Sequence, residues 1–457
     1  MILPDLPALL ERHGLYLIGL EVQVRADGSA PTVDEVRTFL AARRVLAGIA
    51  PGSQYASNAA VVINVAAYED DTIAVATDSG ELGRGQTVEA FFAGLAHSLR
   101  TELVADEDTL VSITGELGPY EGSETPLSID SLTITGPDSP QHVLLGALAS
   151  MPEQGHYGLV GGRGVVLPAQ GMALHGGIAE VPGARAMLPL LSFERSGEVR
   201  SINLYGDTSE DPHVTINSGP DYEAVSAQVP GTAWDIEQGL AKIPRLLCAD
   251  EGPLPKKRGD KKAKASHASA VAAYELLVRA GGELSQSQPQ ELFSNVARLM
   301  GYPAEVASLV QAFDDPAFDP ERRNLAAVPA APEGSGFVHT TGVVGALEVC
   351  EKIGAKAKAK GRAVDVIGKA RTRTLALLGI YALLVLGVIL ANVIPALGTW
   401  LDIEHDIFTR LFSVFLVLGF GFTAVSMWAI LKGLDQARET YTLLSAKNIP
   451  NPLSLED

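Results

Sequence analysis

Two uncharged apolar runs near the C-terminus are the most pronounced hydrophobic pattern in the chain. The first covers residues 374–397 and the second covers residues 411–431. As helices they would be about 36 and about 32 Å long at 1.5 Å per residue, enough to cross the hydrocarbon core of a bilayer. Buried core helices are the alternative, but apolar runs of this length without a charge are typical of membrane spans. We therefore predict a two-helix transmembrane hairpin with a loop at residues 398–410.

Shorter patterns predict an α+β region at the N-terminus. Strand-like alternation or apolar runs cover residues 15–24, 60–67, 72–77 and 109–117. Helix-like patterns cover residues 32–49, which open with the capping box Thr32-Val-Asp-Glu35, and residues 88–99. The order β-α-β-β-α-β predicts a ferredoxin-like sandwich over residues 1–118, with both helices on one face of an antiparallel sheet.

Changes in composition divide the rest of the chain into further segments. We expect, in order, a second, β-rich α+β domain at 119–250, a basic linker at 251–265, a small helical bundle at 266–313, a Pro/Ala-rich linker at 314–340, a basic juxtamembrane helix at 341–373 and, after the hairpin, a cytoplasmic tail at 432–457.

Charge is distributed unevenly along the 457 residues. The chain has 54 acidic and 35 basic residues, and residues 1–250 alone hold 33 acidic and 13 basic ones, a net charge of −20. This balance excludes a generally basic nucleic-acid-binding protein, and the polybasic stretch Lys256–Lys264 is interpreted as a solvated linker. An acidic surface commonly serves solubility, and docking of a partner protein is the alternative.

A cluster of cations precedes the first apolar run. Eight fall within 22 residues: Lys352, Lys356, Lys358, Lys360, Arg362, Lys369, Arg371 and Arg373. Because basic flanks stay on the cytoplasmic side, we predict a protein of the cell membrane with both termini in the cytoplasm. Residues 1–14 lack the features of a signal peptide, which agrees with a cytoplasmic N-terminal region. We expect the eight cations to contact anionic headgroups of the inner leaflet.

Known catalytic and ligand-binding patterns do not emerge from the sequence. The nine histidines include no HExxH pair, and the serines lack a GxSxG elbow. Cys248 and Cys350 belong to no CxxC motif, so we expect neither a disulfide nor structural zinc. We therefore predict no catalytic, metal or cofactor-binding residue and incline against an enzyme.

The preferred hypothesis is a membrane-anchored binding or scaffold protein that holds an acidic region at the inner face of the membrane. An oligomeric cation pore or membrane effector is the alternative, with Asp402, Glu404 and Asp406 of the loop as its acidic mouth. An acidic N-terminal region followed by two C-terminal spans is similar to the order in CorA-type magnesium channels, although their Gly-Met-Asn signature is absent here. Enzyme activity in the N-terminal region is a third hypothesis.

Overall fold

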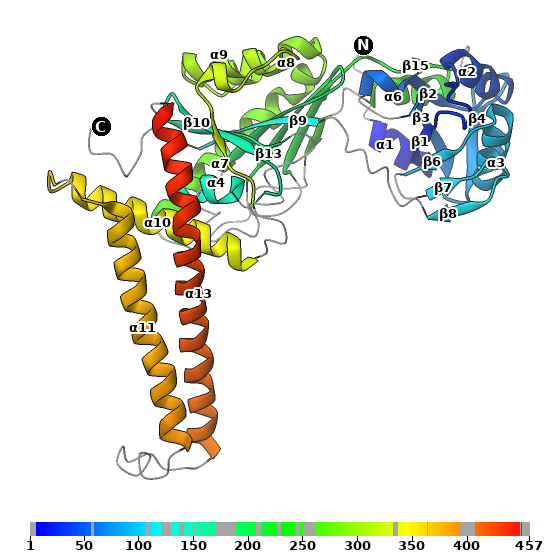
Figure 1. The fold of residues 1–457 in the computed structure, drawn as a ribbon. Helices are drawn as coiled ribbons and strands as arrows, with labels where there is room; N and C mark the ends of the chain where they lie inside the picture. Colours follow the sequence, from blue (N-terminus) through cyan, green and yellow to red (C-terminus); the bar gives the residue numbers. More distant parts are fainter. Residues whose placement is uncertain are drawn as a thin grey trace.

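The chain forms two antiparallel sheets, each with helices on both faces, and a C-terminal pair of long helices (Figure 1). The computed structural model describes residues 6–55, 59–106, 109–119, 129–136, 141–149, 151–169, 189–206, 212–225, 230–243, 247–249, 261–331, 337–362, 364–393, 407–447 and 449. The mixed α+β architecture is as the sequence predicts.

The first sheet is built mainly from the N-terminal residues. Its strands, in spatial order, are β15 (Glu223–Ala224), β2 (Ala47–Pro51), β3 (Val61–Tyr68), β1 (Leu15–Val22), β6 (Leu103–Ala105), β7 (Thr109–Val111) and β8 (Leu117–Pro119). The hairpin of β4 (Thr72–Ala76) and β5 (Leu82–Thr87) extends from β3. Every pairing is antiparallel.

Helices cover both faces of this sheet. On one face, α2 (Val33–Ala42) and α3 (Val88–Leu99) pack on the same apolar cluster, where the rings of Phe39 and Phe91 are 6.1 Å apart. On the other face, α1 (Leu6–Arg12) and α6 (Thr232–Ala241) share a second cluster. Alternate residues of a strand point to opposite faces, so Val65 lies in the first cluster and Ala66 in the second.

Local signals locate some of these elements better than others. The capping box is confirmed: the Glu35 N–H donates to Thr32 Oγ1 at 3.2 Å, and the Thr32 N–H donates to Glu35 Oε2 at 2.7 Å. The helix predicted to reach residue 49 ends at Ala42, because Arg44 adopts a φ of 53° and the chain then enters β2. The last strand predicted at 109–117 is two short strands, and β6 is the strand that pairs with β1. The ferredoxin-like sandwich is not confirmed, since extra strands extend the sheet and α1 and α6 cover its second face.

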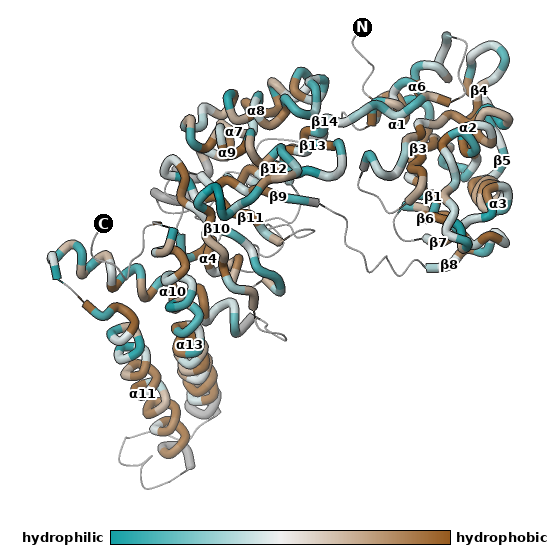
Figure 2. The backbone as a smooth tube through the Cα atoms, turned by 45° about the horizontal axis from the view of Figure 1, so that its top comes forward, coloured by the Kyte–Doolittle hydropathy of each residue, from teal (hydrophilic) through white to brown (hydrophobic). Residues whose placement is uncertain are grey.

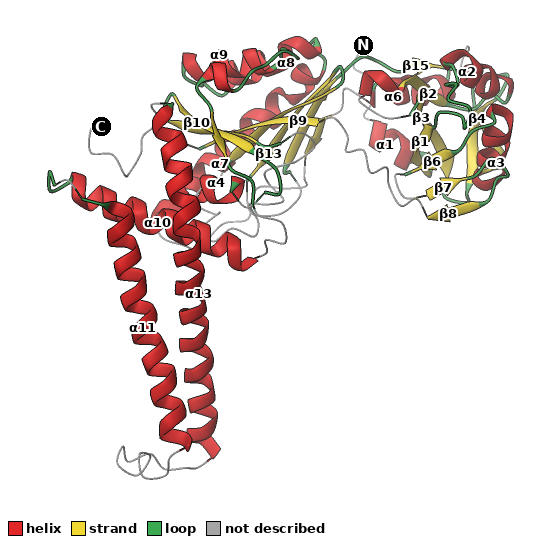
Figure 3. Cartoon of the chain, viewed as in Figure 1, coloured by secondary structure: helices red, strands yellow, loops and turns green. Residues whose placement is uncertain are grey.

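The second sheet forms the central part of the molecule. Its strands, in spatial order, are β16 (Leu247–Ala249), β14 (Val214–Ser218), β13 (Val199–Tyr205), β12 (Leu190–Ser196), β9 (Ile129–Thr135), β11 (Arg163–Leu167), β10 (Gly155–Val160) and β17 (Ala326–Val328). Three helices pack on one face: α7 (Lys261–Ser285), α8 (Pro289–Leu299) and α9 (Ala304–Phe313). Two others, α4 (Gln141–Leu148) and α10 (Phe337–Lys358), pack on the opposite face (Figure 3).

The C-terminal hairpin consists of α11 (Val366–Val393) and α13 (Ile407–Ala446), which project from the second sheet (Figure 1). Both helices are long and apolar enough to span a membrane, as predicted. Their large apolar side chains face outward: Leu383 is 68% exposed and Phe415 is 79% exposed. Figure 2 shows the apolar stretches of both helices clear of the sheets.

Only part of α13 is exposed in this way. From Ala429 onward the helix contributes buried residues to the core between α4, α10 and the second sheet. The buried apolar side chains here are those of Ala429, Ile430, Leu434, Ala437, Tyr441 and Leu444. One continuous helix of 40 residues, about 60 Å at 1.5 Å per residue, therefore belongs to the apolar hairpin at one end and to the core at the other.

Candidate anion-binding site at the basic neck

The chain reverses direction between α10 and α11 in a well-defined turn. Gly361 takes a φ of 58°, its N–H donates to Lys358 O at 3.0 Å, and the Arg362 N–H donates to Ala357 O at 3.1 Å. This pair of bonds is a Schellman C-cap, which ends α10 and needs a residue that tolerates positive φ. Asp365 then caps α11, since its Oδ1 accepts the Gly368 N–H at 2.9 Å. The turn thus brings the basic end of α10 beside the first turns of α11.

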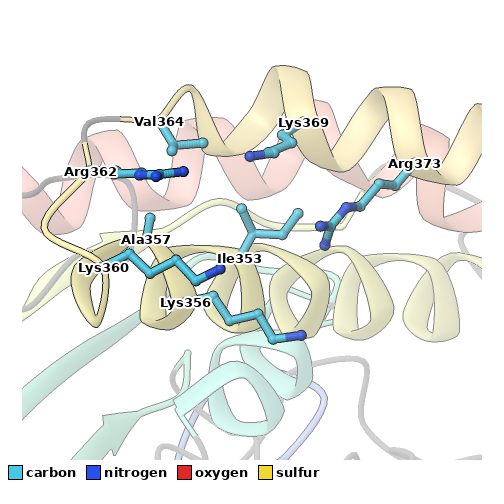
Figure 4. Close-up of a pocket in the computed structure, with 8 residues that line it drawn as sticks. All are labelled: Ile353, Lys356, Ala357, Lys360, Arg362, Val364, Lys369 and Arg373. Atoms are coloured by element: carbon cyan, nitrogen blue, oxygen red, sulfur yellow. The ribbon is translucent and has the colours of Figure 1, made fainter.

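A basic pocket lies between these two helices (Figure 4). Its volume is about 120 Å³, and its lining includes five cations and three apolar residues. The cations are Lys356, Lys360, Arg362, Lys369 and Arg373, and the apolar residues are Ile353, Ala357 and Val364. Figure 4 shows Lys360, Arg362 and Lys369 extending into the space between the helices. For brevity we call these eight residues the neck pocket.

In the part of the chain that the structure describes, the cations of the neck pocket are not matched by acidic side chains. Within the described residues, no carboxylate forms an ion pair with any of the five. The neighbouring Lys352, in contrast, pairs with Glu348 on the same helix. Five like charges that line one pocket repel one another, so an anion placed in the pocket is attracted by them. The arrangement is suited to holding a multiply charged anion.

The neck pocket lies where the apolar surface of the hairpin begins. On α11, Arg373 is followed by Thr374, which is buried, and then by Leu375, which is 51% exposed. The rings of Tyr381 and Phe420 pair α11 with α13 at a centroid distance of 6.2 Å. Counting eight residues, about 12 Å, from each ring puts Arg373 level with Trp428 in the antiparallel pair.

Trp428 has the surroundings of an interfacial aromatic residue, although it falls inside the second apolar run. It is 51% exposed, and Lys432 Nζ lies 5.9 Å from its ring centroid. Tryptophan is enriched at the boundary between lipid and water, where its ring contacts apolar chains and its indole N–H remains hydrated. Trp428 and Arg373 therefore mark one boundary of the apolar surface, with the neck pocket on its polar side.

Close backbone packing fixes α13 against α10 just beyond this boundary. A Cβ on Gly433 would lie 2.5 Å from Gly342 O, and a Cβ on Gly345 would lie 2.7 Å from Ile430 Cγ1. Such distances leave no room for side chains, so glycine permits the helices to cross closely. Tyr441, which is fully buried, lies in the same interface.

The titratable groups near this interface are structural in character. Burial raises the pKa of the Cys350 thiol to about 12 and raises the pKa values of Tyr157 and Tyr441 well above their usual range. His142 Nδ1 lies 2.7 Å from Glu351 Oε2, joining α4 to α10. Among the residues the structure describes, no three His, Cys, Asp or Glu side chains form a group suited to a metal ion.

The structure separates the eight predicted headgroup-contacting cations into two sets. Five line the neck pocket, whereas Lys352, Lys358 and Arg371 do not. Arg371 instead lines a wider depression of about 410 Å³ together with Arg438 of α13, which sequence analysis does not single out. The predicted pore-mouth residues Asp402, Glu404 and Asp406 lie outside the described residues.

A sequence signal for the neck pocket exists in the spacing of its cations. Lys356 and Lys360 are four residues apart, as are Lys369 and Arg373, so each pair lies on one face of its helix. The fold then turns the two faces toward each other.

In comparisons with known proteins, no family model, curated protein or solved structure matches this chain.

Proposed function

We propose that this protein is a two-span membrane protein that holds its acidic N-terminal region at the cytoplasmic face of the membrane as a docking surface for a partner protein. Both termini would lie in the cytoplasm, and the basic segment at residues 352–373, which we call the neck, would lie against the anionic inner leaflet. The loop at residues 398–410 would lie on the opposite side.

The single observation that carries this proposal is the dual environment of α13. Phe415 and Phe422 are 79% and 68% exposed in the apolar half of the helix, whereas Leu434 and Tyr441 are buried in the core with the second sheet. A large exposed apolar surface on two helices that are long enough to cross a bilayer is stabilised by lipid. Because the same helix completes the core, the second sheet would be fixed at the membrane surface.

The charge distribution supports a particular arrangement of the anchored region. Residues near an anionic leaflet gain roughly 1 kcal/mol per Lys or Arg, which favours contact at the neck. The first 250 residues carry a net charge of −20 and would be repelled by the same lipids. In Figures 1 and 2 the first sheet lies at the end of the molecule away from the hairpin. The first sheet, which holds part of this acidic region, would thus remain accessible to a partner.

The central strands of the first sheet give that region a compact core. The order β2-β3-β1-β6, antiparallel throughout and with α2 and α3 on one face, is the order of a ferredoxin-like unit. We propose that β4, β5, β7, β8 and β15 are additions to such a unit. A fold of this kind hosts many functions, so the docking proposal rests on charge and anchoring alone.

The topology is tested with single cysteines and a membrane-impermeant maleimide on intact cells. In a chain that lacks Cys248 and Cys350, Thr399→Cys is expected to react from outside. Ser454→Cys, the matched control near the C-terminus, is expected to react only after permeabilisation. Labelling of both positions, or of Ser454→Cys alone, in intact cells contradicts the proposed orientation.

The docking role is tested by cross-linking the full-length protein in its native membrane and identifying the attached proteins by mass spectrometry. We expect the same partner, attached through residues of the first sheet, after the loop residues Asp402, Glu404 and Asp406 are neutralised. Ion flux through proteoliposomes that disappears in that neutralised variant would instead favour the cation-pore alternative.

A further inference from the structure

We propose that the neck pocket binds the headgroup of one phospholipid that carries a phosphate with more than one negative charge, such as a terminal phosphomonoester. This inference rests on the proposed location of the neck at the membrane. The sequence predicts only a diffuse attraction between eight cations and anionic lipid. The present inference names one specific site and one class of ligand.

The composition of the neck pocket favours phosphate over other anions. Arg362 and Arg373 present planar guanidinium groups that can donate two hydrogen bonds to one phosphate. The three lysines add compact charges around them. A phosphomonoester has three oxygens to share among these donors and a charge near −2, whereas a lipid carboxylate has two oxygens and a charge of −1.

The shape and position of the neck pocket favour a lipid over a free ion. Its apolar residues, Ile353, Ala357 and Val364, offer a surface for the glycerol carbons next to a phosphate. The pocket ends at Arg373, level with Trp428, where the apolar surface of the hairpin begins. A bound phosphate would therefore sit at headgroup depth, with its acyl chains directed along the exposed side chains of α11.

The three remaining cations of the neck provide a matched control. Lys352, Lys358 and Arg371 lie in the same 22-residue stretch but outside the pocket. Removing these three charges or three charges of the pocket changes the net charge equally. If the attraction is diffuse, lipid binding should weaken equally after both changes. If the lipid binds in the neck pocket, binding should weaken only when the pocket charges are removed.

The test uses full-length protein in detergent and native mass spectrometry of lipid adducts. The probes are dioleoyl phosphatidate, dioleoyl phosphatidylserine and dioleoyl phosphatidylcholine, with inorganic phosphate and glycerol 3-phosphate as soluble competitors. The pocket variant is K356Q/K360Q/K369Q, and the control variant is K352Q/K358Q/R371Q. Thermal unfolding of both variants establishes that they fold as the unchanged protein does.

We expect phosphatidate to bind the unchanged protein and the control variant with similar affinity, and to bind the pocket variant about tenfold or more weakly. Phosphatidylserine should bind at least about tenfold more weakly than phosphatidate. An equal loss of phosphatidate binding in both variants would contradict binding in the neck pocket. Equal affinities for phosphatidate and phosphatidylserine would contradict the preference for a phosphomonoester. Displacement of phosphatidate by inorganic phosphate or glycerol 3-phosphate alone at equal concentration overturns the assignment to a lipid.

These outcomes are separable from failure of the proposed function. Binding in detergent does not depend on which side of a membrane the neck faces. A reversed topology in the cysteine-labelling experiment would therefore leave the adduct result unchanged, and a failed adduct experiment would leave the topology result unchanged.

Discussion

Gly433 of α13 and Gly342 of α10 meet backbone to backbone: a Cβ on Gly433 would lie 2.5 Å from the carbonyl oxygen of Gly342. The contact lies five residues beyond Trp428, at the point where α13 leaves the apolar hairpin and enters the core. A helix long and apolar enough to span a membrane and a helix that packs on the second sheet are thereby joined with no side chain between them.

A larger residue at Gly433 should force the two helices apart. Gly433→Leu is expected to lower the free energy of unfolding by about 1–3 kcal/mol or more, the usual cost of overpacking a close contact. The control is Gly421→Leu, because a Cβ on Gly421 meets nothing within 4 Å. Thermal unfolding in detergent measures both. Equal unfolding temperatures for Gly433→Leu and the unchanged protein would show that the contact does not hold the helices together.

Cys350 should report on the same contact through its reactivity. Its thiol is buried in the core that α13 completes, and burial raises its pKa to about 12, so at pH 8 it is protonated. Because the thiolate is the nucleophile, a Cys248→Ser chain is expected to react slowly with maleimide at pH 8. Adding Gly433→Leu should increase the rate by about tenfold or more as the thiol becomes accessible. A rate in the folded Cys248→Ser chain equal to that after denaturation would contradict the burial of this thiol.

The exposed end of α13 should be dispensable for folding, but its buried end should not. Thr374 and Trp428 lie close to level in the antiparallel hairpin, so a flexible linker of about 10 residues can replace residues 375–427. This chain is expected to fold and to remain in solution without detergent. Ending the chain at residue 374 removes Leu434, Tyr441 and Leu444 from the core and should leave it unfolded or aggregated, because each lost side chain costs about 2–5 kcal/mol. Limited proteolysis and circular dichroism distinguish the two products, and equal stability of both would contradict the role of α13 in the core.

Glu237 of α6 should hold the segment around β15 against β2 of the first sheet. Its fully buried Oε1 accepts N–H groups from Val225 at 3.0 Å and from Ala47 at 3.4 Å. Glu237→Ala leaves these donors without that acceptor and is expected to cost about 1–3 kcal/mol. Glu237→Gln keeps an acceptor oxygen and should cost less. Amide exchange in β2 and β15 measures the effect locally, and unchanged protection in Glu237→Ala would argue against this role.

Local patterns in the sequence predict the elements that depend on neighbouring residues. The uncharged runs predict the two hairpin helices, Thr32 and Glu35 predict the start of α2, and the spacing of Phe91, Leu95 and Leu99 predicts α3. Each signal acts within a few turns of helix, where the residue pattern itself sets capping and amphipathicity.

Long-range relationships are what the sequence does not predict. β15 pairs with β2 across more than 170 residues, and nothing in the short segment Glu223–Ala224 specifies that partner. The burial of α13 beyond Ala429 depends on α10 and on the second sheet, which are distant in sequence. The sequence pattern therefore predicts only a tail at 432–457. The neck pocket likewise needs the turn at Gly361 to bring two basic helix faces together.

The central claim is that the hairpin and the second sheet are one rigid unit joined by α13. Pulsed electron spin resonance on full-length protein in lipid nanodiscs tests it most directly, with spin labels at Gln311→Cys on α9 and Phe415→Cys on α13 in a chain lacking Cys248 and Cys350. Phe415→Cys with Thr442→Cys, both on α13, serves as the rigid reference pair. We predict one narrow distance distribution, similar in width to that of the reference pair. A broad distribution for the α9–α13 pair beside a narrow reference would show that the sheet is flexibly tethered and would contradict the account.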